Sequence, residues 1–369
     1  MRNAQDISQA PSQVATAPSG GALRFWKTLQ ALLWIAGIAL LLVMLFNPPL
    51  GVTLFWNILI PVAPALFVVG TGVWRNICPL GTTALLPDRL GISKGLTLSP
   101  SKQSAFNLVG VILLMAIIPL RHVLFNNDGR ATAIIILALA VVAIAVGSVY
   151  ERKSAWCSGL CPVHPVEKFY GSGVAFSVPN AHCDTCLRCS EPCPDSTPSG
   201  GPFSPQKTGV AKATELLLVG GFPGFVWGWF HVPDYSAAQG WLNLHIVYGY
   251  PLLGGAVTVL LYLLAGRLFQ RNNRRMIISL FAAAAVSCYY WFRLPMLFGF
   301  GELPSNGMLV DLSGSLSGWT MPVLNLVTSG FLVWWIVIHK KKRRSWSIRP
   351  EYAEESASSP VPSSASLIA

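Results

Sequence analysis

Four cysteines near the middle of the chain have a spacing that is typical of an iron–sulfur site. The stretch reads C-x2-C-x2-C-x3-C-P and comprises Cys183, Cys186, Cys189, Cys193 and Pro194. Three thiolates two residues apart can wrap one cubane, the fourth follows after a short turn, and the proline prevents the chain from continuing as a helix. Structural zinc usually takes two cysteine pairs with a longer spacer between them. The pattern therefore predicts a [4Fe-4S] cluster, with zinc as the main alternative.

Three further cysteines form a candidate second metal site. Cys157 and Cys161 repeat the C-x3-C-P spacing, and Cys78 precedes a Pro-Leu-Gly sequence. In two-cluster ferredoxins the fourth cysteine of one motif binds the other cluster, so two arrangements are open. In the first, the four motif cysteines bind a single cluster. In the second, Cys193 joins the other three cysteines in a second metal site, and the first cluster keeps a non-cysteine ligand or an open iron.

The composition indicates that these cysteines belong to an integral membrane protein. Of the 369 residues, 53% are hydrophobic and 11% are charged, whereas soluble domains carry roughly 25% charged residues. The net charge of +11 does not indicate nucleic-acid binding, because the basic residues are spread over many loops. Eight cysteines in a chain of this length are not a disulfide framework, and their clustering indicates metal.

Eight apolar stretches are long enough to cross a membrane, which takes about 20 residues. We therefore expect an all-α integral membrane bundle of about eight transmembrane helices with a small cytosolic ferredoxin-like iron–sulfur insert. The fifth stretch contains Gly220, Gly221, Pro223 and Gly224, which are expected to kink it or to make it re-entrant. The stretches run near 25–46, 52–73, 105–125, 131–149, 216–232, 244–265, 276–297 and 319–338.

Composition divides the chain into five segments. The insert is too small for a large apolar core, so a bound cluster would supply much of its folding free energy. The polar ends are expected to be disordered. The segments are an N-terminal tail at 1–22, the first four helices at 23–150 with a Cys-Pro loop at 74–104, the iron–sulfur insert at 151–210, the last four helices at 211–340, and a basic and then disordered tail at 341–369.

Lysine and arginine predict the orientation of the helices. If the amino terminus is cytosolic, all 26 basic residues except Arg121, Arg130 and Arg293 fall in inner segments. Inner loops of membrane proteins carry such an excess of positive charge. We therefore expect a multi-pass protein of the bacterial inner membrane, with both termini and the cluster loop in the cytosol. Cys288 lies within a helix, where we expect a small apolar filler.

Histidines and arginines expected near the outer face supply weaker candidates. His122, His231 and His245 lie at helix ends, where a pair could ligate haem b or flank a quinone; hydrogen bonding at the interface is the simpler interpretation. Arg121 and Arg293 could hold an anionic group there, although snorkelling from helix ends explains them as well.

Candidates also lie on the inner side. His164 and His182 flank the cysteines, and either could be a cluster ligand or form hydrogen bonds to cluster sulfur. Glu215 opens the fifth span near the interface, where we expect it to be solvated. The sequence contains no P-loop, dinucleotide fingerprint or hydrolase elbow.

The chain resembles the polytopic membrane ferredoxins that accompany periplasmic nitrate and nitrous-oxide reductases, and the related cytochrome oxidase assembly ferredoxins. The resemblance covers residues 50–195 and depends on Cys157-x3-Cys161-Pro162, on Cys78-Pro-Leu-Gly and on the cluster loop; Trp74 stands where the earlier copy would have its first cysteine. It implies membrane electron transfer or the support of a metalloenzyme.

The function that these observations favour is one-electron transfer at the cytosolic face of the membrane. The donor would be a quinone pool or a cytosolic protein, and the acceptor a respiratory or metalloenzyme partner, so membrane lipid, a redox protein and quinone are the expected partners. The cofactor would carry the chemistry, in an electron-transfer protein rather than an enzyme with its own substrate. The alternative is an iron–sulfur protein that supports the maturation or regulation of a partner metalloenzyme.

Overall fold

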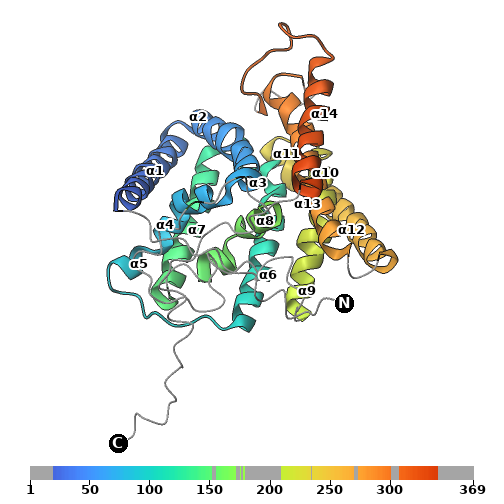
Figure 1. Ribbon diagram of the computed structural model, residues 1–369. Coiled ribbons are helices and arrows are strands. Elements are labelled where there is room, and N and C mark those ends of the chain that lie inside the picture. The colour runs from blue at the N-terminus through green and yellow to red at the C-terminus, as the bar shows by residue number, and fades with distance from the viewer. Residues whose placement is uncertain are drawn as a thin grey trace, which may run out of the picture.

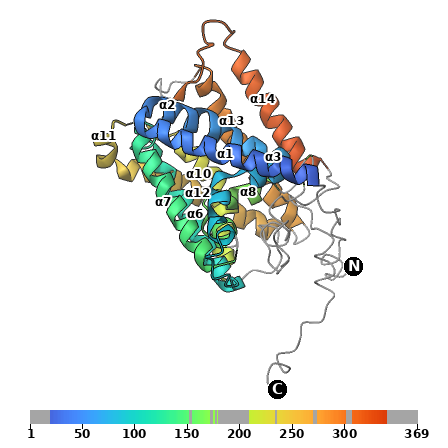
Figure 2. The same cartoon turned by 90° about the vertical axis from the view of Figure 1, so that its left-hand side faces the viewer.

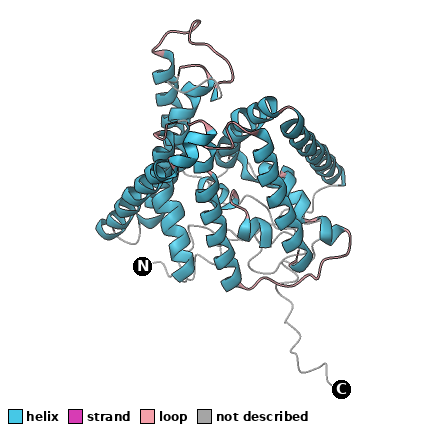
Figure 3. Cartoon of the chain, turned by 180° about the vertical axis from the view of Figure 1, so that it is seen from behind, coloured by secondary structure: helices cyan, strands magenta, loops and turns pink. Residues whose placement is uncertain are grey.

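Helices make up most of the part of the chain that the structure describes (Figure 1). Figure 3 shows the same helices from behind, with no strand among the described residues. The structure is a computed structural model, and it describes residues 20–151, 155–171, 175, 178, 209–233, 235–269, 273–300 and 307–339. The motif cysteines at 183–193, His182, residues 1–19 and residues 340–369 lie outside these residues. The predicted insert at 151–210 is therefore described only in part, chiefly at 155–171, and its cluster loop is not described.

Eight helices in the described residues are long and apolar enough to cross a membrane, which confirms the expected all-α membrane bundle. The first, fourth, sixth, seventh and eighth agree with the predicted ranges to within three residues at both ends. The spans are Leu23–Phe46, Pro48–Ala84, Ser101–Arg121, Gly129–Val149, Gly209–Phe230, Leu244–Leu268, Arg274–Leu297 and Thr320–Ile338.

Two long helices in the first half of the chain, α6 and α7, begin with side-chain caps. The Ser99 side chain accepts a hydrogen bond from the Lys102 N–H ahead of α6, and the Asp128 carboxylate accepts from Arg130 N–H and Ala131 N–H ahead of α7. The helical segments are α1 (Gly20–Phe46), α2 (Pro48–Val52), a π-helix (Thr53–Leu59), α3 (Ile60–Ile77), α4 (Pro79–Ala84), α5 (Leu86–Arg89), α6 (Pro100–Ile117), a 3-10 turn (Pro119–Arg121), α7 (Gly129–Val149), a second π-helix (Trp156–Leu160) and α8 (His164–Tyr170).

The second half contains the last four spans. Figure 1 shows α14 on the opposite side of the molecule from α1, and Figure 2 shows α1 across the near face with α14 along one edge. The segments are α9 (Gly209–Glu215), a π-helix (Leu216–Gly221), α10 (Phe222–Phe230), α11 (Ala237–Leu242), α12 (Leu244–Leu268), α13 (Arg274–Leu297), α14 (Thr320–Val333) and a terminal π-helix (Trp334–Ile338).

The glycines of the fifth span allow α10 and α12 to pack closely. A Cβ atom placed on Gly224 would lie 1.9 Å from the Gly254 carbonyl oxygen, and one on Gly228 would lie 2.2 Å from that of Tyr250. Small residues four positions apart are typical of such helix contacts in membranes. The span is one helical segment that widens into a π-helix at Leu216–Gly221. It is long enough to cross a membrane, and its glycines serve helix packing.

The main core joins the two halves around α8. Phe169 of α8 is fully buried and belongs to the same apolar cluster as Phe67 of α3, Phe225 of α10 and Ile278 of α13. Burial of large aromatic side chains dominates core energetics. The short helix that follows Cys161 is thus fixed in the centre of the protein, as Figure 1 shows.

Candidate functional site

The two Cys-Pro sequences have nearly the same backbone conformation. Cys78 has φ −59° and ψ 118°, and Cys161 has φ −62° and ψ 119°. A residue before proline is driven into this extended region by the proline ring. In both turns the cysteine N–H donates to a tryptophan carbonyl at 2.9 Å, Trp74 in the first and Trp156 in the second. The two loops are therefore similar in backbone conformation as well as in sequence.

The second turn differs from the first in how its helix ends. Cys161 N–H bonds to the carbonyl five residues earlier, so Trp156–Leu160 is a π-helix, whereas Cys78 N–H closes an ordinary α-helical turn. Single π-turns often occur at functional sites. This turn contains Cys157, the extra cysteine that the first copy lacks.

The structure brings the thiols of Cys78, Cys157 and Cys161 into one region, which we call the three-thiol site. A Cβ atom placed on Gly81 would lie 3.7 Å from Cys157 Sγ and 4.0 Å from Cys78 Sγ. The charge of Cys78 acts on Cys161, so these two are also neighbours. All three are half-buried and none forms a disulfide. Two loops from different spans thus contribute to the same site.

The Cys161 thiol is desolvated and receives backbone hydrogen bonds. Burial raises the pKa of this thiol to about 12, and the neighbouring Cys78 also raises it, whereas N–H groups of His164 and Val163 donate to the sulfur and lower it. N–H groups directed at sulfur are the contacts that tune iron–sulfur centres. Because only the thiolate binds metal, loading this site would release a proton from Cys161.

The three thiols are not a closed metal site by themselves. Within the described ranges, no group of three His, Cys, Asp or Glu side chains is arranged to hold a metal ion. Thiolates are soft ligands that suit iron–sulfur clusters and zinc, and the N–H donors fit a sulfur-bound centre. Whether the motif cysteines complete this site remains a prediction, because they lie outside the described residues.

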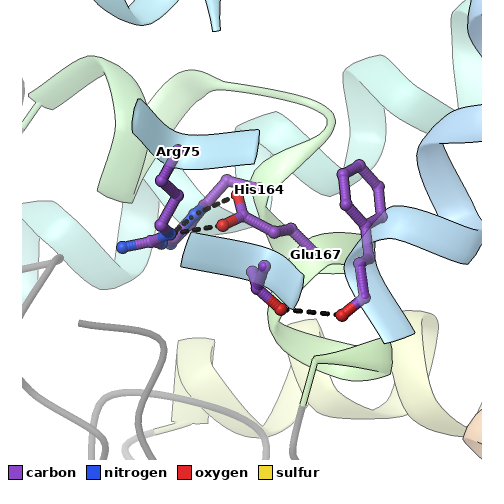
Figure 4. Close-up of polar contacts among 5 residues, drawn as sticks. Arg75, His164 and Glu167 are labelled. Carbon is purple, nitrogen blue, oxygen red and sulfur yellow. Dashed lines mark hydrogen bonds and ion pairs between the residues drawn. The ribbon is translucent and has the colours of Figure 1, made fainter. Parts of the chain in front are cut away.

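A buried charged cluster lies beside the three-thiol site (Figure 4). Arg75 of α3 donates through Nε to Glu167 Oε1 of α8, and its Nη2 lies 2.8 Å from His164 Nδ1. Relative exposures are 8% for Arg75, 2% for His164 and 4% for Glu167. Sequence reasoning named only His164. The missed signal was that Arg75 and Glu167 lie three residues before Cys78 and six after Cys161, on helices in an apolar setting.

Arg121 and Arg293 do not snorkel, so that interpretation is wrong. They are only 6% and 2% exposed, and both contact Trp56. The Arg121 guanidinium carbon lies 4.0 Å from the centre of the Trp56 ring, and Arg293 Nη2 donates to the Trp56 carbonyl at 2.9 Å and to Asn57 Oδ1 at 2.6 Å. We call these residues the arginine–tryptophan cluster. It lies at the end of the second span away from Cys78, because α3 separates Trp56 from that cysteine.

The histidines expected near the outer face do not form a ligand pair in the contacts seen here. His122 is 4% exposed, and its Nε2 lies 3.0 Å from the Trp229 carbonyl oxygen. His231 Nδ1 lies 2.7 Å from the Trp227 carbonyl, and His245 is exposed. These hydrogen bonds to helix carbonyls favour the simpler interpretation.

Two other candidates have structural contacts. Glu215 was expected to be solvated, but both oxygens of its carboxylate accept hydrogen bonds from Arg274 Nη2, at 3.0 Å and 2.9 Å. Its Oε1 also accepts a hydrogen bond from the Tyr262 hydroxyl at 2.5 Å. Its side chain is only 11% exposed, so this ion pair ties α9 to α12 and α13. Cys288 packs against the main core, as expected of an apolar filler.

Comparison with known proteins adds no assignment to this geometry: no family model, curated protein or solved structure matches the chain.

Proposed function

We propose that this protein is a membrane-bound iron–sulfur protein that transfers single electrons at the cytosolic face of the bacterial inner membrane. The observation that carries the proposal is the convergence of Cys78, Cys157 and Cys161 at one end of the membrane helices. Two backbone N–H groups donate to the sulfur of Cys161. Thiolates with N–H donors are the surroundings in which a cluster's reduction potential is set.

The cluster itself is assigned to the motif cysteines, Cys183, Cys186, Cys189 and Cys193. Their C-x2-C-x2-C-x3-C-P spacing is the sequence support for one [4Fe-4S] cluster. The three-thiol site supports the second arrangement, in which Cys193 completes a second metal centre. The excess of lysine and arginine in the same loops supports a cytosolic position.

The position of the thiols limits the route of the electrons. A hydrocarbon core of about 30 Å separates the cytosolic face from any partner on the other side. We therefore propose that a quinone pool or a cytosolic protein donates the electron, and that the acceptor is a respiratory or metalloenzyme partner on the same face. A bound cluster would supply the one-electron chemistry.

Anaerobic purification tests this function. Iron and acid-labile sulfide are quantified, and the dithionite-reduced protein is examined by EPR. One cubane signal that is lost when the motif cysteines are changed to serine supports the single-cluster arrangement. A second signal that is lost when the three-thiol site is changed to serine supports two centres. Cys288→Ser is the matched control and should leave iron unchanged. Zinc or no metal in the purified protein would overturn the proposal.

The open character of the three-thiol site favours one second candidate, the maturation of a partner metalloenzyme. Partly accessible thiols without a closed ligand set among the described residues suit a site that passes metal on. In this case, reduced protein would not exchange electrons with a quinone analogue. A deletion strain would instead accumulate a metal-poor partner enzyme.

A further inference from the structure

The buried charged cluster links the two cysteine loops. Arg75 is in the last turn of α3, directly before the Cys78 turn, and Glu167 is on α8, directly after the Cys161 turn. The bond between Arg75 Nε and Glu167 Oε1 joins residues 92 positions apart in the chain. The contact therefore joins the helix that ends at Cys78 to the helix that follows Cys161.

A third buried side chain contacts both charged groups. His164 Nδ1 lies 2.8 Å from Arg75 Nη2 and 3.4 Å from Glu167 Oε2. Thus the cluster holds a buried guanidinium and a buried carboxylate, and the His164 ring contacts both (Figure 4).

The same short helix contacts the sulfur. Backbone N–H groups of Val163 and His164 donate to Cys161, and the charge of Glu167 acts on the same thiol. Arg75 and Glu167 are both less than a tenth exposed, so solvent screens the effect of their charges only weakly. The ion pair is thus connected to the three-thiol site both mechanically and electrostatically.

From these contacts we infer that Arg75 and Glu167 are positioning residues of the three-thiol site. Their ion pair holds the two Cys-Pro turns in fixed positions relative to each other, and the two opposite charges compensate each other beside the thiols. This inference rests on the proposed metal centre for its electrostatic part only. If the ion pair only held the two helices together, removing one of its charges would not shift the reduction potential of a bound centre. The two roles can therefore be distinguished by measuring that potential.

Variants that remove one charge at a time distinguish these roles. In Glu167→Gln the arginine stays charged, so the uncompensated positive charge should raise the midpoint potential of the centre. In Arg75→Gln the uncompensated carboxylate should lower it, by less if the carboxyl group takes up a proton. The double variant, which is neutral, should return the potential towards that of the wild type. Opposite shifts with restoration support the inference.

The matched control is the Glu215–Arg274 ion pair, which ties other helices together and involves none of the cysteines. Glu215→Gln should leave the midpoint potential unchanged. Equal losses of metal in both single variants, without shifts of opposite sign, would overturn the electrostatic role. So would a shift in Glu215→Gln as large as that in Glu167→Gln.

A metal-free measurement keeps the positioning role testable if the proposed function fails. In full-length protein with the motif cysteines and Cys157 changed to serine, a short bifunctional thiol reagent can join Cys78 to Cys161. Cross-linking should slow several-fold in Arg75→Gln and in Glu167→Gln, at unchanged single-site labelling. An unchanged cross-linking rate would overturn the positioning role. Absence of metal in the wild type would overturn the proposed function and the electrostatic role, but not the positioning role.

Discussion

The two ends of the second span both bury arginine, but they stabilise its charge in different ways. At the cysteine end, Arg75 forms an ion pair with Glu167. At the opposite end, Arg121 and Arg293 contact the ring and the carbonyl of Trp56. The first arrangement joins two charges of opposite sign from separate loops, whereas the second surrounds positive charge with an aromatic face and neutral oxygens.

The two arrangements differ in how much stability is lost when one contact is removed. Removing one partner of a buried ion pair leaves an uncompensated charge, which costs about 3–5 kcal/mol. A cation–π contact contributes only about 0.5–2 kcal/mol. Single substitutions at the cysteine end should therefore lower the stability of the protein more than single substitutions at the opposite end. The opposite end can tolerate substitution of one contact, because several weaker contacts hold the same guanidinium groups.

The largest effect should come from a change that lies at neither end. In Gly224→Val the new side chain would meet the Gly254 backbone, which cannot move aside as a flexible side chain can. We expect a loss above about 4 kcal/mol, the range of exceptional mutants, and little folded protein in detergent. Gly266→Val on α12 meets no atom within 4 Å and is the control. Equal yields of monodisperse protein from both variants would show that α10 and α12 do not pack this closely.

An intermediate effect is expected at the cysteine end. Glu167→Ala should destabilise the protein by about 3–5 kcal/mol, because Arg75 is left buried without its carboxylate. Glu215→Ala should cost less, about 1 kcal/mol, because its partner Arg274 is 32% exposed and water can solvate it. Denaturant unfolding in detergent, monitored by tryptophan fluorescence, measures both. If the two variants lose equal stability, the contrast between buried and accessible ion pairs is wrong.

The sequence predicted the helices because crossing a membrane requires length and apolarity, which are local properties. It did not predict the contacts between helices. Arg121 near a helix end has the same local sequence whether it snorkels or turns inward over Trp56. Likewise, Gly224 predicted a kink or a re-entrant segment, and its close approach to Gly254 of another helix is seen only in the structure.

The candidate site divides in the same way. The sequence placed Cys78, Cys157 and Cys161 in one candidate site, and the structure brings them together and gives the two Cys-Pro turns a common conformation. No local pattern connects Arg75 to Glu167, since they meet only when α3 and α8 pack. The motif cysteines remain a prediction from spacing alone.

The smallest effect should appear at the opposite end and is best measured as a coupling. A double-mutant cycle of Trp56→Leu and Arg121→Gln isolates the ring–guanidinium contact at 4.0 Å. We expect a coupling of about 0.5–2 kcal/mol. Each single variant removes other contacts too, since the Trp56 indole N–H also lies 3.4 Å from Thr132 Oγ1. The cycle cancels those contributions. A coupling as large as the loss in Glu167→Ala would mean that the two ends bury arginine at similar strength, and the contrast between them would then lie in charge rather than in stability.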